Sequence, residues 1–390
     1  MLRERGWNQF KKLGLPTKNS STFRYLPLRE FYEASFALPV KRPIDARSDA
    51  TIVFVDGEYR AELSNLSALP KSVVALPLSE AMRSYAGFLS QRLAIEESTP
   101  FAALNGAFCP EGLFFYVPRN VEVTAPIHCL HLITAEEGES LICSPRLHLV
   151  VGSGATLHWI ARTEQRASAS CWINQYLDIS IDEGASFHYT PFRARMEKSW
   201  TFDTLRATIK QKGSLKSIGV TTGGRCHFQQ AYVSLLGEES SVELQGLSYL
   251  SGNQQAHTHV VVDHQAPNTR SNQLFKGVLS DHALSSFEGK ILVRQAAQKT
   301  EAYQMNNHLI LGNRAQAKSR PNLEIFADDV KASHGATVTQ VDEEQLFYLK
   351  TRGITQEAAK ELLIQGFCKE VVDLLPSDLQ EEFLRESKIF

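Results

Sequence analysis

The stretch RLHLVVGSGAT, residues 146–156, carries the pattern on which the fold prediction depends. Leu147, Leu149 and Val151 fall on one face of an extended chain, because successive side chains of a β-strand point to opposite faces. A Gly-Ala step begins three residues after the last of them, at Gly154. Glycine suits a sharp turn because it adopts positive φ without a Cβ clash. The stretch therefore predicts a short strand that ends in a tight turn.

The same design recurs along the chain. In YLDISIDEGAS, residues 176–186, alternating apolar side chains precede Gly184, and ATIKQKGSLKS, residues 207–217, repeats the design loosely with Gly213. The turn glycines are separated by 30 and 29 residues. A period of this size in strand-rich sequence is typical of stacked coils, each burying its apolar face on the next. We therefore predict a mainly β fold built as a β-helix, with a β-sandwich as the alternative that spacing alone leaves open.

Three regions are expected: a largely helical region at 1–105, the β-helix core at 106–330 and a helical region at 331–390. Near residue 80, helical spacing of apolar residues follows Ser79, a candidate N-cap, and Pro100 is expected to end that segment. Near the C-terminus, Asp342 with Gln345 predicts a capping box and Thr355 a second N-cap.

The C-terminal helices are expected to cap the end of the solenoid and to serve as a docking platform for a partner protein. Bundle packing is expected to bury most of their apolar residues, which are Leu346, Phe347, Leu349, Leu362, Leu363 and Phe367.

Composition narrows the class of function. The formal net charge of the 390-residue chain is −2, with acids and bases mixed throughout, which does not favour binding to nucleic acid or to an anionic membrane. No apolar run approaches the ~18 residues of a membrane span, and the first ten residues lack the apolar stretch of a signal peptide. We expect a cytoplasmic protein.

The six cysteines do not share a metal-binding spacing. We expect reduced thiols, and neither a zinc site nor a cysteine-ligated iron–sulfur cluster held by this chain alone. The sequence contains no phosphate-binding GxxxxGK[ST] motif and no GxSxG or HExxH motif, so we expect no enzymatic activity.

One run does suggest a metal site. In GNQQAHTHVVVDH, residues 252–264, His257 and His259 project from one face of a predicted strand, and Asp263 falls on the same face. The run resembles half of a cupin metal motif, although the glycine-to-histidine gap is one residue short and no downstream segment supplies the remaining ligand. A cupin-like metal-dependent enzyme is thus the alternative function, and histidines exposed to solvent are the simpler interpretation.

A more extensive resemblance covers the last third of the chain. The segments at 263–293, 297–311 and 327–354, which include AYQMNNHLIL and ADDVKASHGATV, resemble the SufB/SufD family of iron–sulfur cluster assembly proteins, and its SufD branch in particular. Fainter similarity extends upstream through FAALNGAF, residues 101–108.

The resemblance implies a right-handed parallel β-helix flanked by helical regions, and a scaffold subunit without catalytic activity of its own. It implies pairing with a SufB-like subunit, docking of a SufC-like ABC ATPase on the C-terminal helices, and an indirect interaction with sulfur-donor proteins. A transient iron–sulfur cluster would assemble at the SufB–SufD interface, with no tightly bound cofactor in the isolated chain. A homodimer is an alternative state in isolation.

Residues matching the family motifs support the SufD branch. SufB-like chains carry a key cysteine where this chain has Met305, and a glutamate where it has Gly335. A thioether cannot form a persulfide. Ala332 departs from the cysteine that is common in the SufD branch, and GFCKEV, residues 366–371, is closer to a SufB tail.

The resemblance also assigns candidate site residues. His334 would face the SufB-like subunit, either as a ligand of the nascent cluster or as a hydrogen-bonding group at the seam, and a neutral imidazole can bind ferrous iron. His308 is a second candidate ligand. Tyr348, Lys350 and Arg352 are the expected exposed contacts for a partner.

Overall fold

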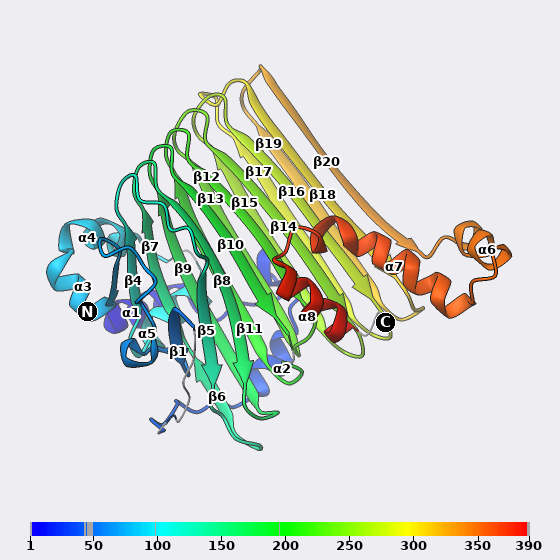
Figure 1. Ribbon diagram of the computed structural model, residues 1–390, viewed down its shortest axis with the longest axis horizontal. Helices are drawn as coiled ribbons and strands as arrows, with labels where there is room; N and C mark the ends of the chain where they lie inside the picture. The colour runs from blue at the N-terminus through cyan, green and yellow to red at the C-terminus, as the bar shows by residue number, and fades with distance from the viewer. Residues whose placement is uncertain (1, 43, 45–49, 98, 195, 388–390) are drawn as a thin grey trace.

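The computed structural model describes residues 2–42, 44, 50–97, 99–194 and 196–387. Its centre is a parallel β-solenoid, in which the chain passes alternately through two facing sheets (Figure 1). Each coil from β7 onward contributes one strand to each sheet, and strands of successive coils pair in parallel. The prediction of a parallel β-helix is confirmed, and the sandwich alternative is wrong.

The two sheets are named A and B here. In sheet order, sheet A contains β19 (Gln316–Ile325), β17 (Leu284–Val293), β15 (Gln255–His264), β13 (Cys226–Leu235), β11 (Trp200–Ile209), β9 (Ser170–Ile181), β7 (Arg146–Val151), β4 (Leu113–Val117) and β3 (Val74–Pro77), with β6 (Ser140–Cys143) paired to β9. Sheet B contains β2 (Glu58–Tyr59), β1 (Ile52–Val55), β5 (Ile127–Ile133), β8 (Thr156–Gln165), β10 (Ser186–Arg193), β12 (Ser214–Thr221), β14 (Ser241–Leu250), β16 (Arg270–Leu279), β18 (Thr300–Ile310) and β20 (Val330–Gln340).

The turn from sheet A to sheet B explains the sequence period. One position in it has positive φ in six successive coils, at Gly154, Gly184, Lys212, Glu239, Asn268 and Lys299. Its amide donates to a carbonyl of the next coil, for example from Gly184 to Gln211 O at 2.9 Å. The prediction of a glycine turn is therefore confirmed at Gly154 and Gly184. At the third turn Lys212, rather than Gly213, adopts the left-handed conformation.

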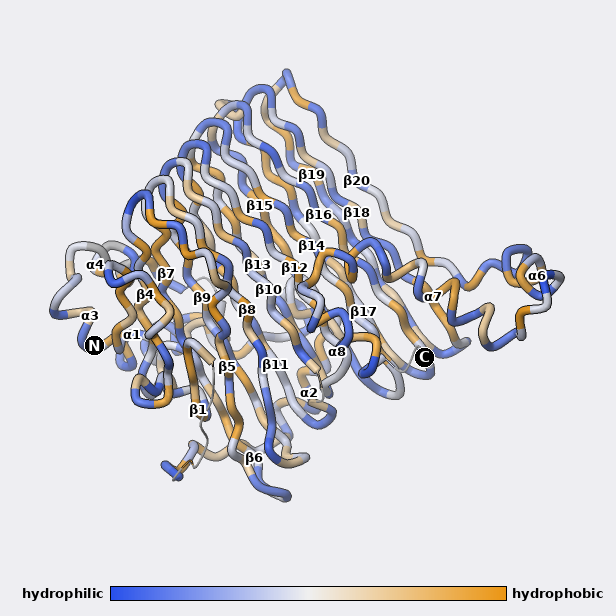
Figure 2. Tube along the Cα trace, in the orientation of Figure 1, coloured by the Kyte–Doolittle hydropathy of each residue, from blue (hydrophilic) through white to orange (hydrophobic). Residues whose placement is uncertain are grey.

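The interior of the solenoid is apolar in the first coils and more polar in the last ones. The main core cluster includes Phe115, Trp159 and Leu177 and extends to Phe287. Figure 2 shows hydrophobic residues concentrated in the first strands, with hydrophilic residues more frequent towards β18 and β19. Because successive side chains of a strand point alternately inward and outward, the hydrophilic residues at inward positions of the later coils lie in the core.

The N-terminal region combines helices with strands of the solenoid. Its helices are α1 (Leu2–Leu13), η1 (Ser21–Phe23), α2 (Leu28–Glu33), η2 (Ala61–Leu63), α3 (Leu78–Ser84), α4 (Ala86–Ala94) and α5 (Pro100–Phe108). Because β1 pairs with β5 and β3 with β4, both sheets begin well before residue 106. Two local predictions are wrong: Ser79 binds Glu111 through its hydroxyl instead of capping, and Pro100 begins α5 after the N-cap Thr99.

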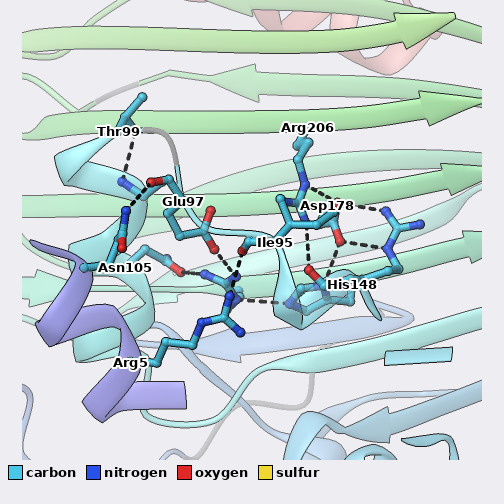
Figure 3. Close-up of polar contacts among 12 residues, drawn as sticks. Arg5, Ile95, Glu97, Thr99, Asn105, His148, Asp178 and Arg206 are labelled. Atoms are coloured by element: carbon cyan, nitrogen blue, oxygen red, sulfur yellow. Dashed lines mark hydrogen bonds and ion pairs between the residues drawn. The ribbon is translucent and has the colours of Figure 1, made fainter. Parts of the chain in front are cut away.

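Two contacts attach these helices to the outer face of sheet A. One is an aromatic cluster in which Phe31 and Phe101 pack against Trp172 and Phe202. The other is a buried ionic network around Asp178 of β9, where Figure 3 shows His148 and Arg206 converging on the carboxylate.

Arg92 of α4 joins this network with two hydrogen bonds to the Asp178 carboxylate, of 2.8 and 2.9 Å. Burial alone would raise the pKa of the Asp178 carboxyl, but the hydrogen bonds and charges of His148 and Arg92 hold it well below its usual range. Burial lowers the pKa of His148 to about 4. The network therefore ties α4 to the solenoid through an ionised aspartate.

The C-terminal helices are α6 (Glu343–Thr351), α7 (Gln356–Val372) and α8 (Ser377–Ser387). Both predicted N-caps are confirmed, since Asp342 accepts from the amides of Glu344 and Gln345 and Thr355 from that of Ala358. The predicted start of the helical region at 331 is wrong, because residues 330–340 form β20 and the first helix begins at Glu343.

The helices neither form the bundle that was expected nor cap the end of the solenoid, where β19 and β20 remain edge strands. α7 packs on the outer face of sheet B, with Ile364 and Val371 in one cluster with Val278 and Leu309. α6 buries none of its residues and lies beyond the body of the solenoid (Figure 1). Phe347 and Leu362 are 69% and 47% exposed, so bundle packing does not bury them.

None of the described helices is both long enough and apolar enough to cross a membrane.

Candidate partner interface at the open end of the solenoid

The solenoid ends in two edge strands. β20 is the last strand of sheet B and β19 is the last of sheet A, and within the described residues each has a sheet neighbour on one side. An unpaired strand edge presents backbone donors and acceptors that another chain can engage. Large apolar side chains are exposed at the same end of the molecule, namely Tyr303, Met305, Ile325, Phe326 and Val338.

His334 lies on this edge. It is exposed near the middle of β20 and stands opposite Gln304 of β18 in the register. Its neighbours Gly335 and Ala336 are small, so another chain could approach the imidazole closely. The position is compatible with both predicted roles of His334, that of a cluster ligand and that of a seam hydrogen bond.

His308 is placed differently. It is buried inside the solenoid, where Nε2 lies 3.0 Å from Ser285 Oγ, and burial lowers the pKa of its imidazole to about 4. In the register it stands opposite Val338, four residues along β20 from His334. With a rise of about 3.3 Å per residue, the two histidines are on the order of 13 Å apart along the strand. The structure does not bring these candidate ligands together.

The two residues that indicated the SufD branch are in contact. Met305 of β18 stands opposite Gly335 of β20, and a Cβ added at Gly335 would lie 2.8 Å from Met305 Cε and 2.9 Å from Sδ. The thioether therefore occupies the space that a glutamate side chain at 335 would enter. Met305 and Gly335 form one matched pair on the edge.

The predicted contacts on α6 are exposed. Arg352 donates from Nη2 to the hydroxyl of Tyr348 at 3.2 Å, and its guanidinium lies 5.1 Å from the Tyr348 ring centroid. Lys350 donates to Gln356 Oε1 at 3.2 Å. With Phe347 beside them, these residues form an amphipathic patch on a helix that buries none of its side chains.

The histidines of the alternative metal site are not exposed to solvent as expected. His257 is buried, with Nδ1 2.7 Å from Ser286 Oγ and Nε2 3.1 Å from Gln255 Oε1, and burial lowers its pKa to about 3. Nδ1 of His259 lies 3.9 Å from Glu288 Oε2. Asp263 instead accepts from Arg294 at 2.9 Å. Both nitrogens of His257 are engaged, and the strand belongs to a solenoid, which excludes the closed barrel of a cupin.

All six cysteines are buried as free thiols, and burial raises the pKa of each. The described residues contain no group of three or more His, Cys, Asp or Glu side chains that could hold a metal ion.

Sequence reasoning missed the apolar part of the edge. Val338 and Phe326 are exposed, but in sequence they have the alternation of a buried strand and its flank. The available signal was the predicted N-cap at Asp342, since a strand followed by a helix instead of another coil has no neighbour to cover it.

Two family models match this chain. Residues 131–367 match the family described as "SUF system FeS cluster assembly, SufBD core domain", and residues 1–129 match the "SufBD protein N-terminal region". The chain is 29% identical over 387 residues to the iron–sulfur cluster assembly SufBD family protein slr0076 of Synechocystis, covering 93% of this chain and 84% of that one.

Two further relatives are similar to this chain. The iron–sulfur cluster assembly protein SufD of Escherichia coli is 27% identical over 376 residues, covering 94% of this chain and 87% of that protein. Protein ABCI7, chloroplastic, of Arabidopsis thaliana is 30% identical over 294 residues, covering 71% and 60%. With two family profiles spanning most of its length on a parallel β-solenoid, the chain belongs to the SufBD family of iron–sulfur cluster assembly proteins.

Proposed function

We propose that this protein is a SufD-like scaffold subunit without catalytic activity of its own, which pairs with a SufB-like subunit and docks a SufC-like ATPase. A nascent iron–sulfur cluster is assembled at the interface of the two related subunits. The cluster is the cargo of the complex, and the isolated chain holds no tightly bound cofactor.

The observation that carries this proposal is the open edge formed by β20. Its backbone can extend sheet B into a second subunit, and the exposed Val338 and Phe326 supply apolar area that pairing would remove from water. The polar His334, on the same strand as Val338, provides a group for recognition or for binding iron.

The residues at the edge favour the role of a scaffold over that of a sulfur acceptor. The thioether of Met305 occupies the position of the SufB-like cysteine, and the described thiols of this chain are all buried. Because persulfide chemistry requires an accessible thiolate, the partner subunit must supply it.

The position of α6 supports docking of the ATPase. The helix presents Phe347, Tyr348 and Arg352 away from the solenoid, while α7 anchors it. The anchor includes Lys276 of β16, which donates to Phe367 O at 2.9 Å and contacts Glu370 at 2.6 Å. A force applied at α6 can thus reach sheet B through one packed helix.

Co-expression with SufB-like and SufC-like subunits, followed by size-exclusion chromatography, tests the partners. Val338→Lys places an uncompensated charge on the edge and is expected to release the SufB-like subunit while the ATPase stays bound. The matched control is Leu236→Lys, at an exposed apolar residue in a turn of the solenoid. Equal co-elution of both variants with the SufB-like subunit would contradict the edge assignment.

The ATPase site has its own variant. Tyr348→Ala is expected to release the ATPase and to retain the SufB-like subunit, whereas Leu374→Ala, at an exposed leucine after α7, is expected to retain both. Retention of the ATPase by a Phe347→Ala/Tyr348→Ala double variant would place its dock elsewhere.

His334→Ala separates the ligand role from the seam role. We expect an intact complex and a lower yield of iron–sulfur cluster in cells, measured by absorbance of a co-expressed cluster acceptor. A complex that falls apart would assign His334 to the seam, and a normal yield from an intact complex would remove it from the cluster site.

A further inference from the structure

A column of mostly polar or small side chains runs along the face of sheet B that points into the solenoid. The column follows the strand register from coil to coil, and its members are His131, Thr163, Arg193, Thr221, Ser248, Gly277, His308 and Val338. They alternate along their strands with outward residues such as Phe192, Leu247 and Leu309, which contact the C-terminal helices. The column therefore points into the solenoid, beside the apolar core.

Polar side chains of sheet A face this column. Asp203 Oδ2 lies 3.3 Å from Arg193 Nη2 and 3.2 Å from His227 Nε2. These residues line a cavity of about 30 Å³ together with Thr258, and the cavity extends to Ser285, Asn306 and His308 in later coils. Asp203 and His227 keep 14% and 13% of their side-chain surface accessible although they point inward, so they face space rather than packed atoms.

Several buried atoms around this cavity have no hydrogen-bond partner among the described residues. They are Nε and Nη1 of Arg193, Oδ1 of Asp203, Oδ1 of Asn306 and Nδ1 of His308, and Thr163 Oγ1 continues the series one coil earlier. Arg193, Asn306 and His308 are each at least 97% buried. A buried polar atom without a partner costs free energy comparable to a lost hydrogen bond, so such atoms normally bind ordered water.

We propose that this cavity of the solenoid interior is a water-binding site, in which at least two ordered water molecules bind polar atoms of the lining. The number follows from the volume, because one water needs about 10–15 Å³ of such space. An anion is disfavoured by the Asp203 carboxylate and a cation by the Arg193 guanidinium, whereas water can donate to one and accept from the other. The ligand is thus a small neutral molecule with both donor and acceptor groups.

The lining of the cavity reaches from the middle of the solenoid towards its open end. His308 is the last polar member of the column, and Val338 of the edge strand lies over it. A neutral imidazole donates from one nitrogen and accepts at the other, so His308 can bind a water molecule at Nδ1 while Nε2 contacts Ser285.

The test counts long-lived internal waters of the full chain by magnetic relaxation dispersion of water ¹⁷O. Thr258→Val keeps the side-chain volume and removes a hydroxyl that lines the cavity. It is expected to lose at least one long-lived water relative to the wild type. The matched control, Thr208→Val, changes a threonine of β11 whose hydroxyl bonds Ile179 O, and it is expected to keep the wild-type count.

A crystal structure at high resolution provides the second measurement, which does not depend on any variant. Water density within hydrogen-bond distance of Arg193 Nε and His308 Nδ1 is the expected result. Equal water counts in the wild type and Thr258→Val, or a cavity without density beside those two atoms, would overturn the proposal.

Discussion

Removing the negative charge of Asp178 should loosen the N-terminal helices from the solenoid. Asp178→Asn keeps the shape of the side chain but leaves Arg92 and Arg206 without the carboxylate that neutralises them. The carboxylate is fully buried and the two arginines are 15% and 18% exposed, so water compensates the loss only in part. The amide NH₂ of asparagine would also face guanidinium donors.

The size of the effect follows from the contacts. Four hydrogen bonds of 2.8–3.0 Å reach the carboxylate, two of them from Arg92. Breaking a buried ion pair by removing one partner costs about 3–5 kcal/mol. We expect the free energy of unfolding of Asp178→Asn to fall by about 3 kcal/mol, because the arginines can move part of the way to solvent.

Urea unfolding followed by tryptophan fluorescence measures the change, and hydrogen exchange of residues 86–94 locates it in α4. Asp182→Asn is the matched control, since Asp182 follows the same strand but pairs with Lys210 at the surface, where an ion pair contributes about 1 kcal/mol or less. Similar losses for the two variants, or unchanged exchange in α4, would refute the assignment of the network as the clamp.

Three further predictions concern stability. Gly184→Ala should destabilise the protein by about 1 kcal/mol, because φ is +64° at this position and the cost comes from the backbone alone, since an added Cβ would meet no other atoms. Gly366→Ala, inside α7, should stabilise the protein by up to about 1 kcal/mol. Urea midpoints measure both changes, and a change of the same sign in the two variants would contradict the turn argument. Thr355→Ala removes the N-cap of α7 and should cost about 1 kcal/mol, with faster amide exchange confined to the first turn of that helix and unchanged exchange there counting against the cap. The pKa of His257 is about 3 in the folded protein and about 6.5 in the unfolded one, so the contribution of the neutral imidazole to stability is complete above pH ~6.5 and is lost as the pH falls towards 3. Between pH 6 and 4, a plot of the free energy of unfolding against pH should have a slope about 1.4 kcal/mol per pH unit smaller for His257→Gln than for the wild type. Parallel plots for the two proteins would contradict this.

The repeating coils, two helix caps and the family were predicted from the sequence. A period near 30 residues favoured the solenoid over a sandwich, since a coil with one apolar face is stable only when a neighbour covers it. The caps at Asp342 and Thr355 followed from side chains that bond amides within three residues. The family and its SufD-like character followed from long motifs in the last third of the chain.

The turn residues show a feature that local sequence rules did not predict. Gly213 looks like the third member of the glycine series, yet Lys212 carries the positive φ. The amide of Lys212 donates to Glu238 O of the next coil, and the stacking of coils holds the residue in a conformation it would rarely adopt alone.

The burial of histidines also depended on the assembled fold. His257, His308 and His334 occupy strands of similar composition, but only His334 is exposed, because β20 is the last strand and no coil follows it. The sequence by itself determined the repeating coil, the helix caps and the family, because these depend on residues close together in the chain or on whole motifs. The tertiary structure alone decided which histidine meets a partner, which polar side chains enclose a cavity and which helix stays uncovered, because these depend on how coils far apart in sequence stack and on where the stack ends.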